Sequence, residues 1–364
     1  MFIVNIRPVL QLVSAIGLVV FSASISAQKK LIDQNQREVV IPESIERIVG
    51  ITIPSASTVI TLDKGVERLV GMNPTAKRNI EDSVMRDMFP NALSVPGNMA
   101  GDGFAPNVEA ILAARPDIIF QWGDRGESIL SPIESLNIPL VTFKYGNTDY
   151  VNEWFKLTGL AIGREERAQE ILSYFERTRD VIEENVAQNT QPKPKVLFLF
   201  RYRSGFQVGG TGTSMHTDIE RAGGINVAAQ QTGFKAINAE QLLLWNPDII
   251  LLTNFESGLT PATLFNDPLL SNINAIKNKR VYQYPKGGFV WEPPSQETPL
   301  TWQWLHGLFY PKSFSIDLKD EMKSYYKLLY NYELTNDEMN QILRIEENKG
   351  SESYQKLFIN QYDT

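Results

Sequence analysis

One short pattern occurs twice in the chain, and it constrains the fold more than any other feature. The segment NVEAILAARPDIIF begins at Asn107 and NAEQLLLWNPDIIL begins at Asn238, with glutamate two residues later and Pro-Asp-Ile-Ile at the same offset. In each copy the asparagine can cap a helix, the glutamate suits the positive end of the helix dipole, and the proline ends the helix. The apolar run that follows is typical of a parallel strand covered on both faces. Each copy therefore predicts a helix–turn–strand unit.

Other apolar segments surround the two copies in a similar order. Alternating strands and helices in two blocks predict an α/β fold with two Rossmann-like lobes, each built on a parallel sheet. Two widely separated copies are too few for a solenoid. The predicted strands cover residues 47–52, 68–72, 117–122 and 139–145 in the first lobe and 195–202, 248–254 and 280–285 in the second, and the helices between them include 55–63 and 215–222.

Residues 164–188 predict one long helix between the two blocks, because small or apolar side chains such as Ala168, Ile171 and Phe175 recur at helical spacing. At 1.5 Å per residue this helix is about 37 Å long. A single stiff helix allows a small hinge motion between the lobes. We therefore expect an N-terminal lobe over 28–150, a spanning helical linker over 151–190, a C-terminal lobe over 191–312, and C-terminal helices over 313–364 that pack back on the lobes.

The first 27 residues differ from the rest of the chain. Arg7 is followed by an apolar run over 9–21 and then by small residues. This order predicts a secretory signal peptide, residues 1–27, with cleavage near Ala27. The alternative is an uncleaved membrane anchor, although the apolar run is shorter than the roughly 20 residues that span a bilayer.

Composition narrows the possible partners and compartments. The chain has no cysteine, so its core has to hold it together without disulfides, and attachment through a lipid-modified cysteine is excluded. An exported protein of this kind fits the periplasm. The net charge of −7, from 35 basic and 42 acidic residues, argues against a nucleic-acid partner.

Several of these segments together resemble the substrate-binding proteins of ABC importers for ferric siderophores, haem and cobalamin, the class with one spanning helix. The resemblance runs over about residues 40–345. It rests on four segments that follow one another in the order typical of that class: residues 46–72, the Asn107 unit, IERAGGINVA at 219–228 and the Asn238 unit. It implies a monomer that binds without catalysis and needs no cofactor of its own. It also implies that the partner is an ABC permease in the inner membrane. The implied ligand is a small-molecule metal chelate that carries its own metal, with iron as the favoured metal.

Ligands of parallel α/β sheets bind beyond the carboxyl ends of the strands. Arginine there suits carboxylate, catecholate or hydroxamate oxygens, but it can equally form an inter-lobe ion pair or a rim charge. Aromatic residues there suit a flat chelate, but they can also be ordinary packing. The predicted ligand-binding residues are Trp122, Tyr145, Arg201, Tyr202, Arg203, Tyr284 and Trp291, and the resemblance adds Met99 from the loop 97–104.

Histidine and glycine residues offer further hypotheses. His216 precedes a predicted helix and is either a metal ligand at a vacant coordination position or a polar helix-start residue. His306 lies in an aromatic helix, where a packed structural histidine is expected. The run GGTGTS over 209–214 lacks the rest of a nucleotide-binding motif. With two histidines and no cysteine, a classical structural zinc site is not expected. A metal wrapped in an organic chelator fits better, and an oxyanion such as molybdate stays open.

The resemblance also implies docking on the permease through an exposed glutamate of each lobe, for which Glu127 and Glu256 occupy suitable places. The alternative for either residue is an ordinary solvated side chain.

Two other functions compete with transport. The first is an enzyme such as a glycosyltransferase or reductase, but the sequence contains neither a nucleophile–base pair nor a complete dinucleotide fingerprint. The second is a sensor that reports ligand to a membrane receptor, and the sequence does not distinguish a sensor from a transport protein.

Overall fold

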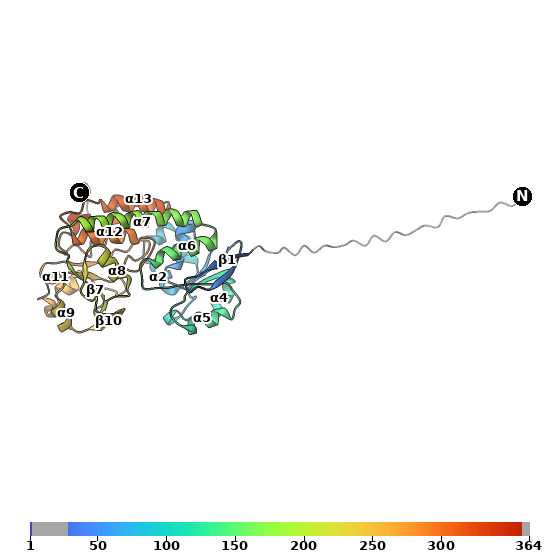
Figure 1. The fold of residues 1–364 in the computed structure, drawn as a ribbon, viewed down its shortest axis with the longest axis horizontal. Coiled ribbons are helices and arrows are strands. Elements are labelled where there is room, and N and C mark those ends of the chain that lie inside the picture. The colour runs from blue at the N-terminus through green and yellow to red at the C-terminus, as the bar shows by residue number, and fades with distance from the viewer. Residues whose placement is uncertain (2–27, 359–364) are drawn as a thin grey trace.

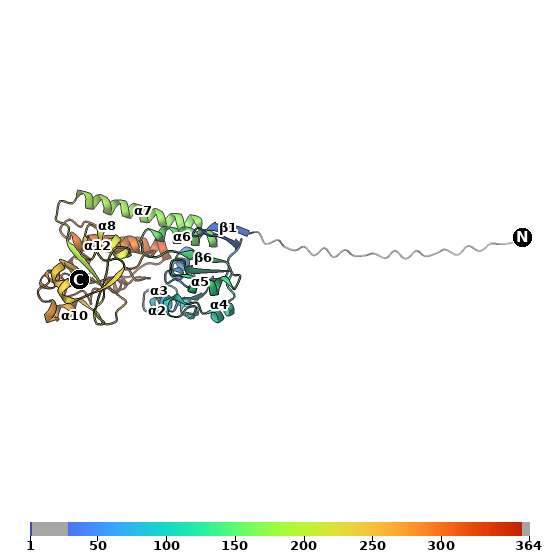
Figure 2. The ribbon, with the colours of Figure 1, turned by 60° about the horizontal axis from the view of Figure 1, so that its bottom comes forward.

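The computed structural model describes residue 1 and residues 28–358, which form two α/β lobes side by side (Figure 1). The helix α7, Glu165–Gln188, runs along both lobes (Figure 2). The predicted fold class is therefore confirmed. The signal peptide expected over 1–27, its cleavage near Ala27 and the membrane-anchor alternative fall on residues outside this description. Within the described part of the chain, no helix combines the length and the apolarity needed to cross a bilayer.

The first lobe contains a four-stranded parallel sheet with the order β4-β3-β5-β6. All five residues of β5 are buried, as predicted for a strand covered on both faces. The strands are β3 Ile48–Gly50, β4 Leu69–Met72, β5 Ile118–Trp122 and β6 Leu140–Phe143, and the helices of this lobe include α1 Ser55–Asp63, α2 Pro74–Glu81, α3 Met85–Met88, α4 Val108–Ala114 and α5 Glu127–Glu134.

The second lobe contains a mixed sheet. β7, β11 and β12 are parallel, as predicted, and β9 adds a short parallel pair with β7. β8 runs antiparallel to β7, and β10 runs antiparallel to β8. These two strands were not predicted; β8 leads into the glycine-rich run 209–214, and β10 reaches it only by pairing with β8. The strands are β7 Lys195–Arg201, β8 Phe206–Gly209, β9 Ile225–Asn226, β10 Phe234–Ile237, β11 Ile249–Leu252 and β12 Val281–Gln283, and the helices include α8 Ser214–Arg221, α9 Ala239–Trp245, α10 Pro261–Phe265 and α11 Asn274–Lys277.

The two copies of the repeated pattern fold in the same way. The Asn107 side chain accepts a hydrogen bond from the Ala110 N–H at 3.2 Å, and the Asn238 side chain accepts one from the Gln241 N–H at 2.8 Å. Both helices end in a residue with left-handed backbone, directly before the proline. Each copy is a helix–turn–strand unit, as predicted.

Segments far apart in sequence close one edge of each sheet. The hairpin β1 Gln28–Ile32 and β2 Glu38–Pro42 brings Asp33 to β6, where its carboxylate accepts hydrogen bonds from the Thr142 hydroxyl at 2.6 Å and N–H at 3.2 Å. On the other lobe, the Asn348 amide pairs with the backbone of Gln283 in β12, at 2.7 and 3.1 Å. Both edge strands thus have their exposed backbone groups partly satisfied.

The C-terminal helices pack on both lobes. Tyr325 stacks on Tyr174 of α7 with ring centroids 3.9 Å apart, and the Tyr174 hydroxyl donates to Glu321 at 2.6 Å. The helix α13 also contacts α1 of the first lobe. It is therefore a second helical bridge beside α7; helices that pack back on the lobes were expected here, but this bridging role was not predicted. The C-terminal helices are α12 Thr298–Phe309, α13 Leu318–Tyr330, α14 Asn336–Ile342 and α15 Tyr354–Phe358, whereas α6 Tyr150–Ile162 precedes α7 and packs on α1 and β1 of the first lobe.

Candidate functional site

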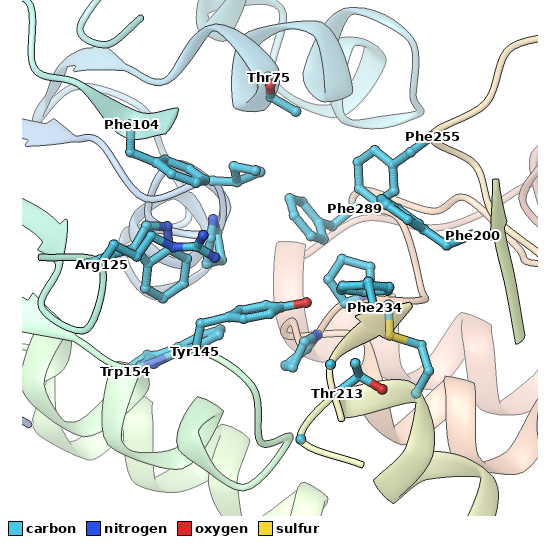
Figure 3. A pocket seen from close by; sticks show the side chains of 18 of the residues that line it. Thr75, Phe104, Arg125, Tyr145, Trp154, Phe200, Thr213, Phe234, Phe255 and Phe289 are labelled. Carbon is cyan, nitrogen blue, oxygen red and sulfur yellow. The ribbon is translucent and has the colours of Figure 1, made fainter. Parts of the chain in front are cut away.

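A cavity of about 560 Å³ lies between the two lobes, at the carboxyl ends of β3, β5, β7 and β11 (Figure 3). Both lobes contribute side chains to it. The first lobe supplies Ile53, Pro54, Thr75, Phe104, Trp122, Arg125, Tyr145 and Trp154, and the second supplies Phe200, Arg201, Gly212, Thr213, Met215, Gly233, Phe234, Phe255, Phe289, Pro293 and Pro294.

The wall of the first lobe is a cluster of aromatic rings around Trp122. Because β5 ends at Trp122 and β6 ends two residues before Tyr145, both side chains emerge at the same sheet edge. The Trp122 ring packs edge-on against Tyr145 at 5.7 Å, Trp154 at 5.5 Å and Phe104 at 6.2 Å. Edge-to-face contacts of this kind fix the rings relative to one another, so this wall is preformed.

Arg125 covers this aromatic cluster with its guanidinium group (Figure 3). The guanidinium carbon lies 4.8 Å from the ring centroid of Phe104, 5.5 Å from that of Tyr145 and 5.8 Å from that of Trp122. Within residues 28–358 no carboxylate pairs with it, and the adjacent Asp124 accepts the Tyr145 N–H at 2.9 Å. Rings hold the guanidinium group by cation–π attraction and leave its N–H donors open to an anion.

The second lobe places another arginine on the opposite wall. The Arg201 guanidinium donates to the carbonyl oxygens of Phe200 at 3.0 Å and Phe255 at 3.1 Å, and its central carbon lies 3.9 Å from the Phe200 ring centroid. Phe200 in turn packs on Phe234, with centroids 4.5 Å apart. The group is thus fixed, and some of its five donors remain for a ligand.

The charge of the cavity is positive on both walls. Among its described lining residues there is no Asp, Glu, Lys or His, and apart from the indole groups of the two tryptophans the polar side chains are the two arginines, Thr75, Thr213 and Tyr145. Burial raises the pKa of Tyr145, so its phenol stays protonated and can donate a hydrogen bond at neutral pH. Such a cavity can bind an anion with a flat or apolar body, and it has no nucleophile with an adjacent base.

Three of the predicted ligand-binding residues, Trp122, Tyr145 and Arg201, come together at the cavity. Their contact with a ligand stays a prediction. Arg125 was not among the predicted residues, although it follows the strand-end segment Trp122–Asp124 directly. The phenylalanines that complete the lining come from several loops, and no local pattern marks them.

Tyr202 and Arg203 lie away from the cavity, because the chain turns outward after β7. The Tyr202 hydroxyl donates to Asp267 at 2.6 Å, and Arg203 is exposed and donates to the Gly258 carbonyl at 3.0 Å. The Glu256 carboxylate fixes this turn by accepting the N–H groups of both residues, at 2.7 and 2.9 Å. We therefore remove Tyr202 and Arg203 from the candidate site.

Tyr284, Trp291 and Met99 are buried inside the protein and do not line the cavity. Tyr284 packs between Phe198 and Trp304, and the Trp291 indole donates to Glu297 at 2.7 Å. Met99 fills the space over Gly71, where a Cβ atom would come within 2.5 Å of the methionine side chain. All three are structural in this arrangement, so they also leave the candidate site.

Neither histidine reaches the cavity. His216 Nδ1 lies 3.3 Å from the Asn226 amide nitrogen, which directs that ring nitrogen into the second lobe. His306 is buried, as predicted, and burial lowers its pKa. In the described part of the chain, no group of three or more His, Cys, Asp or Glu side chains could hold a metal ion. The role expected for His216, as a ligand at a vacant position of a chelated metal, needs no such group and stays a prediction.

The two glutamates expected at the permease differ in exposure. Glu127 is exposed in the first turn of α5, whereas Glu256 is half-buried and bonded to two backbone N–H groups. Glu109 and Glu240, in contrast, are both exposed, and each lies in the first turn of one of the repeated helices.

Comparisons with known proteins agree on one class. A family model described as periplasmic binding protein matches residues 56–287. The molybdate-binding protein MolA of Haemophilus influenzae is 27% identical over 335 residues, which cover 85% of this chain and 93% of that protein. The iron(3+)-hydroxamate-binding protein FhuD of Bacillus subtilis is 26% identical over 53% of this chain and 62% of its own length. A solved periplasmic solute-binding protein of Veillonella parvula is 31% identical, with a TM-score of 0.81 over 89% of this chain and 99% of that chain.

Proposed function

The chain belongs to the periplasmic binding protein family, whose members bind solutes for ABC importers and are not enzymes, and we propose that it captures an anionic metal chelate between its two lobes. The chelate that we favour is a ferric siderophore. The chelate brings its own metal, so the protein needs no cofactor. Binding closes the lobes slightly around the ligand, because the closed form makes more contacts with it.

The observation that carries this proposal is the pair of arginines, Arg125 and Arg201, on facing aromatic walls with no acidic residue in the lining. A cavity of about 560 Å³ suits a small organic ligand, since such pockets span about 300–1,000 Å³. Ferric catecholates and carboxylates combine negative charge with a compact body, and the former add aromatic rings. A protonated Tyr145 favours hydrogen bonding to such a chelate over direct coordination of its iron.

Molybdate is the second candidate, supported by the relative MolA, which matches 85% of this chain. A bare oxyanion needs several converging N–H or O–H donors. The two arginines and Thr213 could supply some of them, but most of the aromatic lining would then contact nothing. Haem, cobalamin and a nickel chelate are further alternatives, but they are larger or less negatively charged than the ligand that the volume and the positive charge of the cavity favour.

A titration with named probes tests the proposal. We expect ferric tris-catecholate or ferric citrate to quench tryptophan fluorescence saturably at one equivalent, with the chelate recovered unchanged, and sodium molybdate to cause no change. Calorimetry with the same compounds gives the affinities. Tight binding of molybdate, together with no response to any ferric chelate or to haem, would reject the chelate and leave the oxyanion.

The partner that we infer is an ABC permease in the inner membrane, and the location is the periplasm after removal of residues 1–27. The chain acts as a monomer. For docking on the permease we replace the predicted pair, Glu127 and Glu256, with another pair. When the two copies of the repeated pattern are aligned, Glu127 falls opposite Gly258 and Glu256 falls opposite Arg125, so the two glutamates do not occupy equivalent positions.

Glu109 and Glu240 are the docking residues that we propose instead. They occupy equivalent positions in the two lobes, and each has an exposed leucine three residues later, Leu112 at 50% and Leu243 at 40%. Two matching patches suit a permease built from two similar subunits. Exposed carboxylates contribute more to orientation than to affinity.

A further inference from the structure

Besides the helices α7 and α13, a direct contact next to the cavity joins the two lobes. The loop 144–149 of the first lobe lies against residues 210–221 of the second. A Cβ atom on Gly146 would lie 2.9 Å from the Gly212 carbonyl oxygen, and Gly146 has a φ of +106°. Glycine is therefore required there both for the backbone conformation and for the close approach of the two lobes.

A buried carboxylate lies at the centre of this contact. Asp218 of α8 accepts a hydrogen bond from the Thr148 hydroxyl of the first lobe at 3.0 Å and from the Trp302 indole of α12 at 2.7 Å. Thr148 is fully buried and Asp218 is 2% exposed. Bonds to a buried carboxylate are among the stronger ones, because leaving the carboxylate without donors carries its full desolvation cost.

Arg221, one turn after Asp218, extends the contact outward. Its guanidinium pairs with Asp149 at 3.0 Å and Glu183 of α7 at 3.4 Å, and it lies 4.7 Å from the Trp302 ring centroid. Both acidic partners are more than half exposed, so these pairs add little stability. They connect α8 to the loop and to α7 at the same place.

The contact is linked to both walls of the cavity. Tyr145, next to Gly146, lines the first wall, and Thr213 and Met215, on either side of Ser214, line the second. The Thr148 hydroxyl also lies 3.4 Å from the Ser214 carbonyl oxygen. A shift between Thr148 and Asp218 therefore moves side chains on both walls.

We propose that Asp218 is a positioning residue: through Thr148 it fixes the separation of the two cavity walls, and the lobes turn about this contact when a ligand enters. Asp218 does not line the cavity, so it acts through the lobes and not on the ligand. The turning of the lobes on ligand entry rests on the proposed binding function. The separation of the walls that Asp218 fixes does not depend on it, so the test uses ligand-free protein.

The absence of cysteine from the sequence makes the test direct. Spin labels on Ala113→Cys in α4 and Ala236→Cys in β10, both exposed sites, report the inter-lobe distance by pulsed electron paramagnetic resonance. We expect one narrow distance distribution in the parent protein. Thr148→Val, which removes the donor and keeps the shape, should shift or widen it, and Thr148→Ser should restore it.

Thr158→Val is the matched control, because Thr158 is a buried threonine of α6 in the first lobe. It should leave the distribution unchanged. If Thr148→Val does not fold, as judged by circular dichroism, Asp218→Asn weakens the same hydrogen bond by removing the charge of its acceptor, and it should also widen the distribution. An unchanged distribution in the folded Thr148→Val protein, or in Asp218→Asn where that variant is the one used, would overturn the proposal whatever the ligand is.

Discussion

The Glu297 carboxylate accepts a 2.7 Å hydrogen bond from the Trp291 indole at a place where neither side chain is more than 1% exposed. The hydroxyl groups of Tyr330 and Tyr326 donate to the same carboxylate at 2.6 and 2.9 Å, and the Gly288 N–H donates at 2.9 Å. Among the described residues no cation pairs with it. Burial raises the pKa of Glu297 to about 7, against the effect of these donors.

The contribution of Glu297 to stability should therefore decrease as the pH rises towards neutrality, whereas His306, whose pKa burial lowers, acts in the opposite direction. Because the pKa of Glu297 is higher in the folded protein than its ordinary value of 4.5, the folded state binds this proton more tightly than the unfolded chain. The resulting stabilisation is complete below about pH 4.5 and is lost as the pH rises through about 7. Asp218, whose pKa burial raises to about 6, acts in the same direction.

Glu297→Gln should make this pH dependence shallower, because an amide does not titrate. Thermal melts followed by circular dichroism between about pH 5 and pH 8 measure it, since each kcal/mol shifts Tm by roughly 2–4 °C in domains of this size. Glu38→Gln, at an exposed glutamate, is the control and should retain the slope. An identical slope in all three proteins would contradict the role given to Glu297.

Arg125→Gln should weaken binding of an anionic chelate such as ferric tris-catecholate by about tenfold to a hundredfold, the equivalent of roughly 1.5–3 kcal/mol for a charge-assisted hydrogen bond. The affinity should also depend less on salt, because one exposed charge is gone. Arg203→Gln is the matched control, since Arg203 is an exposed arginine outside the cavity. Fluorescence titration measures both variants, and equal affinities for them would remove Arg125 from the site.

Much of the fold followed from local signals in the sequence. Caps such as Asn107 and Asn238, helix-ending prolines and short apolar runs act within a few residues, so the repeated units and the parallel strands could be predicted. β8 and β10 could not, because their short segments gain their pairing from each other and from β7. The bridging role of α13 depends on contacts between residues far apart in sequence, such as Tyr174 and Tyr325.

The candidate site could be predicted only where a strand leads directly into it. Trp122, Tyr145 and Arg201 lie at strand ends, and the topology alone brings them to the cavity. Tyr202 was misplaced because Glu256, more than fifty residues later, holds the backbone after β7 in its outward turn. The phenylalanines of the lining depend on loop courses that tertiary packing decides.

The helix caps of the repeated units allow a paired stability test. Asn107→Ala and Asn238→Ala should each lower the free energy of unfolding by about 1 kcal/mol, the usual contribution of a cap. The loss should be larger for Asn107, whose amide also donates to the Asn98 carbonyl at 3.0 Å. Urea denaturation gives the values, with Asn91→Ala at an exposed site as control. No loss in either variant would show that these caps are dispensable.

Reversing the charge of the proposed docking residues should separate ligand binding from transport. Glu109→Lys and Glu240→Lys leave the cavity intact, so the affinity for the chelate should not change. Each should raise the protein concentration needed to stimulate the ATPase of the importer, reconstituted in liposomes, by roughly tenfold, or about 1.4 kcal/mol, and the double variant should do so further.

Glu127→Lys provides the control for this experiment, because it makes the same charge change at another exposed first-turn glutamate of the first lobe. If Glu127→Lys impairs stimulation and Glu109→Lys does not, the docking surface lies beside α5 and not beside the repeated helix α4. If only one of Glu109→Lys and Glu240→Lys has an effect, the two lobes contact the permease unequally, and the correspondence between the repeat and a two-subunit partner fails.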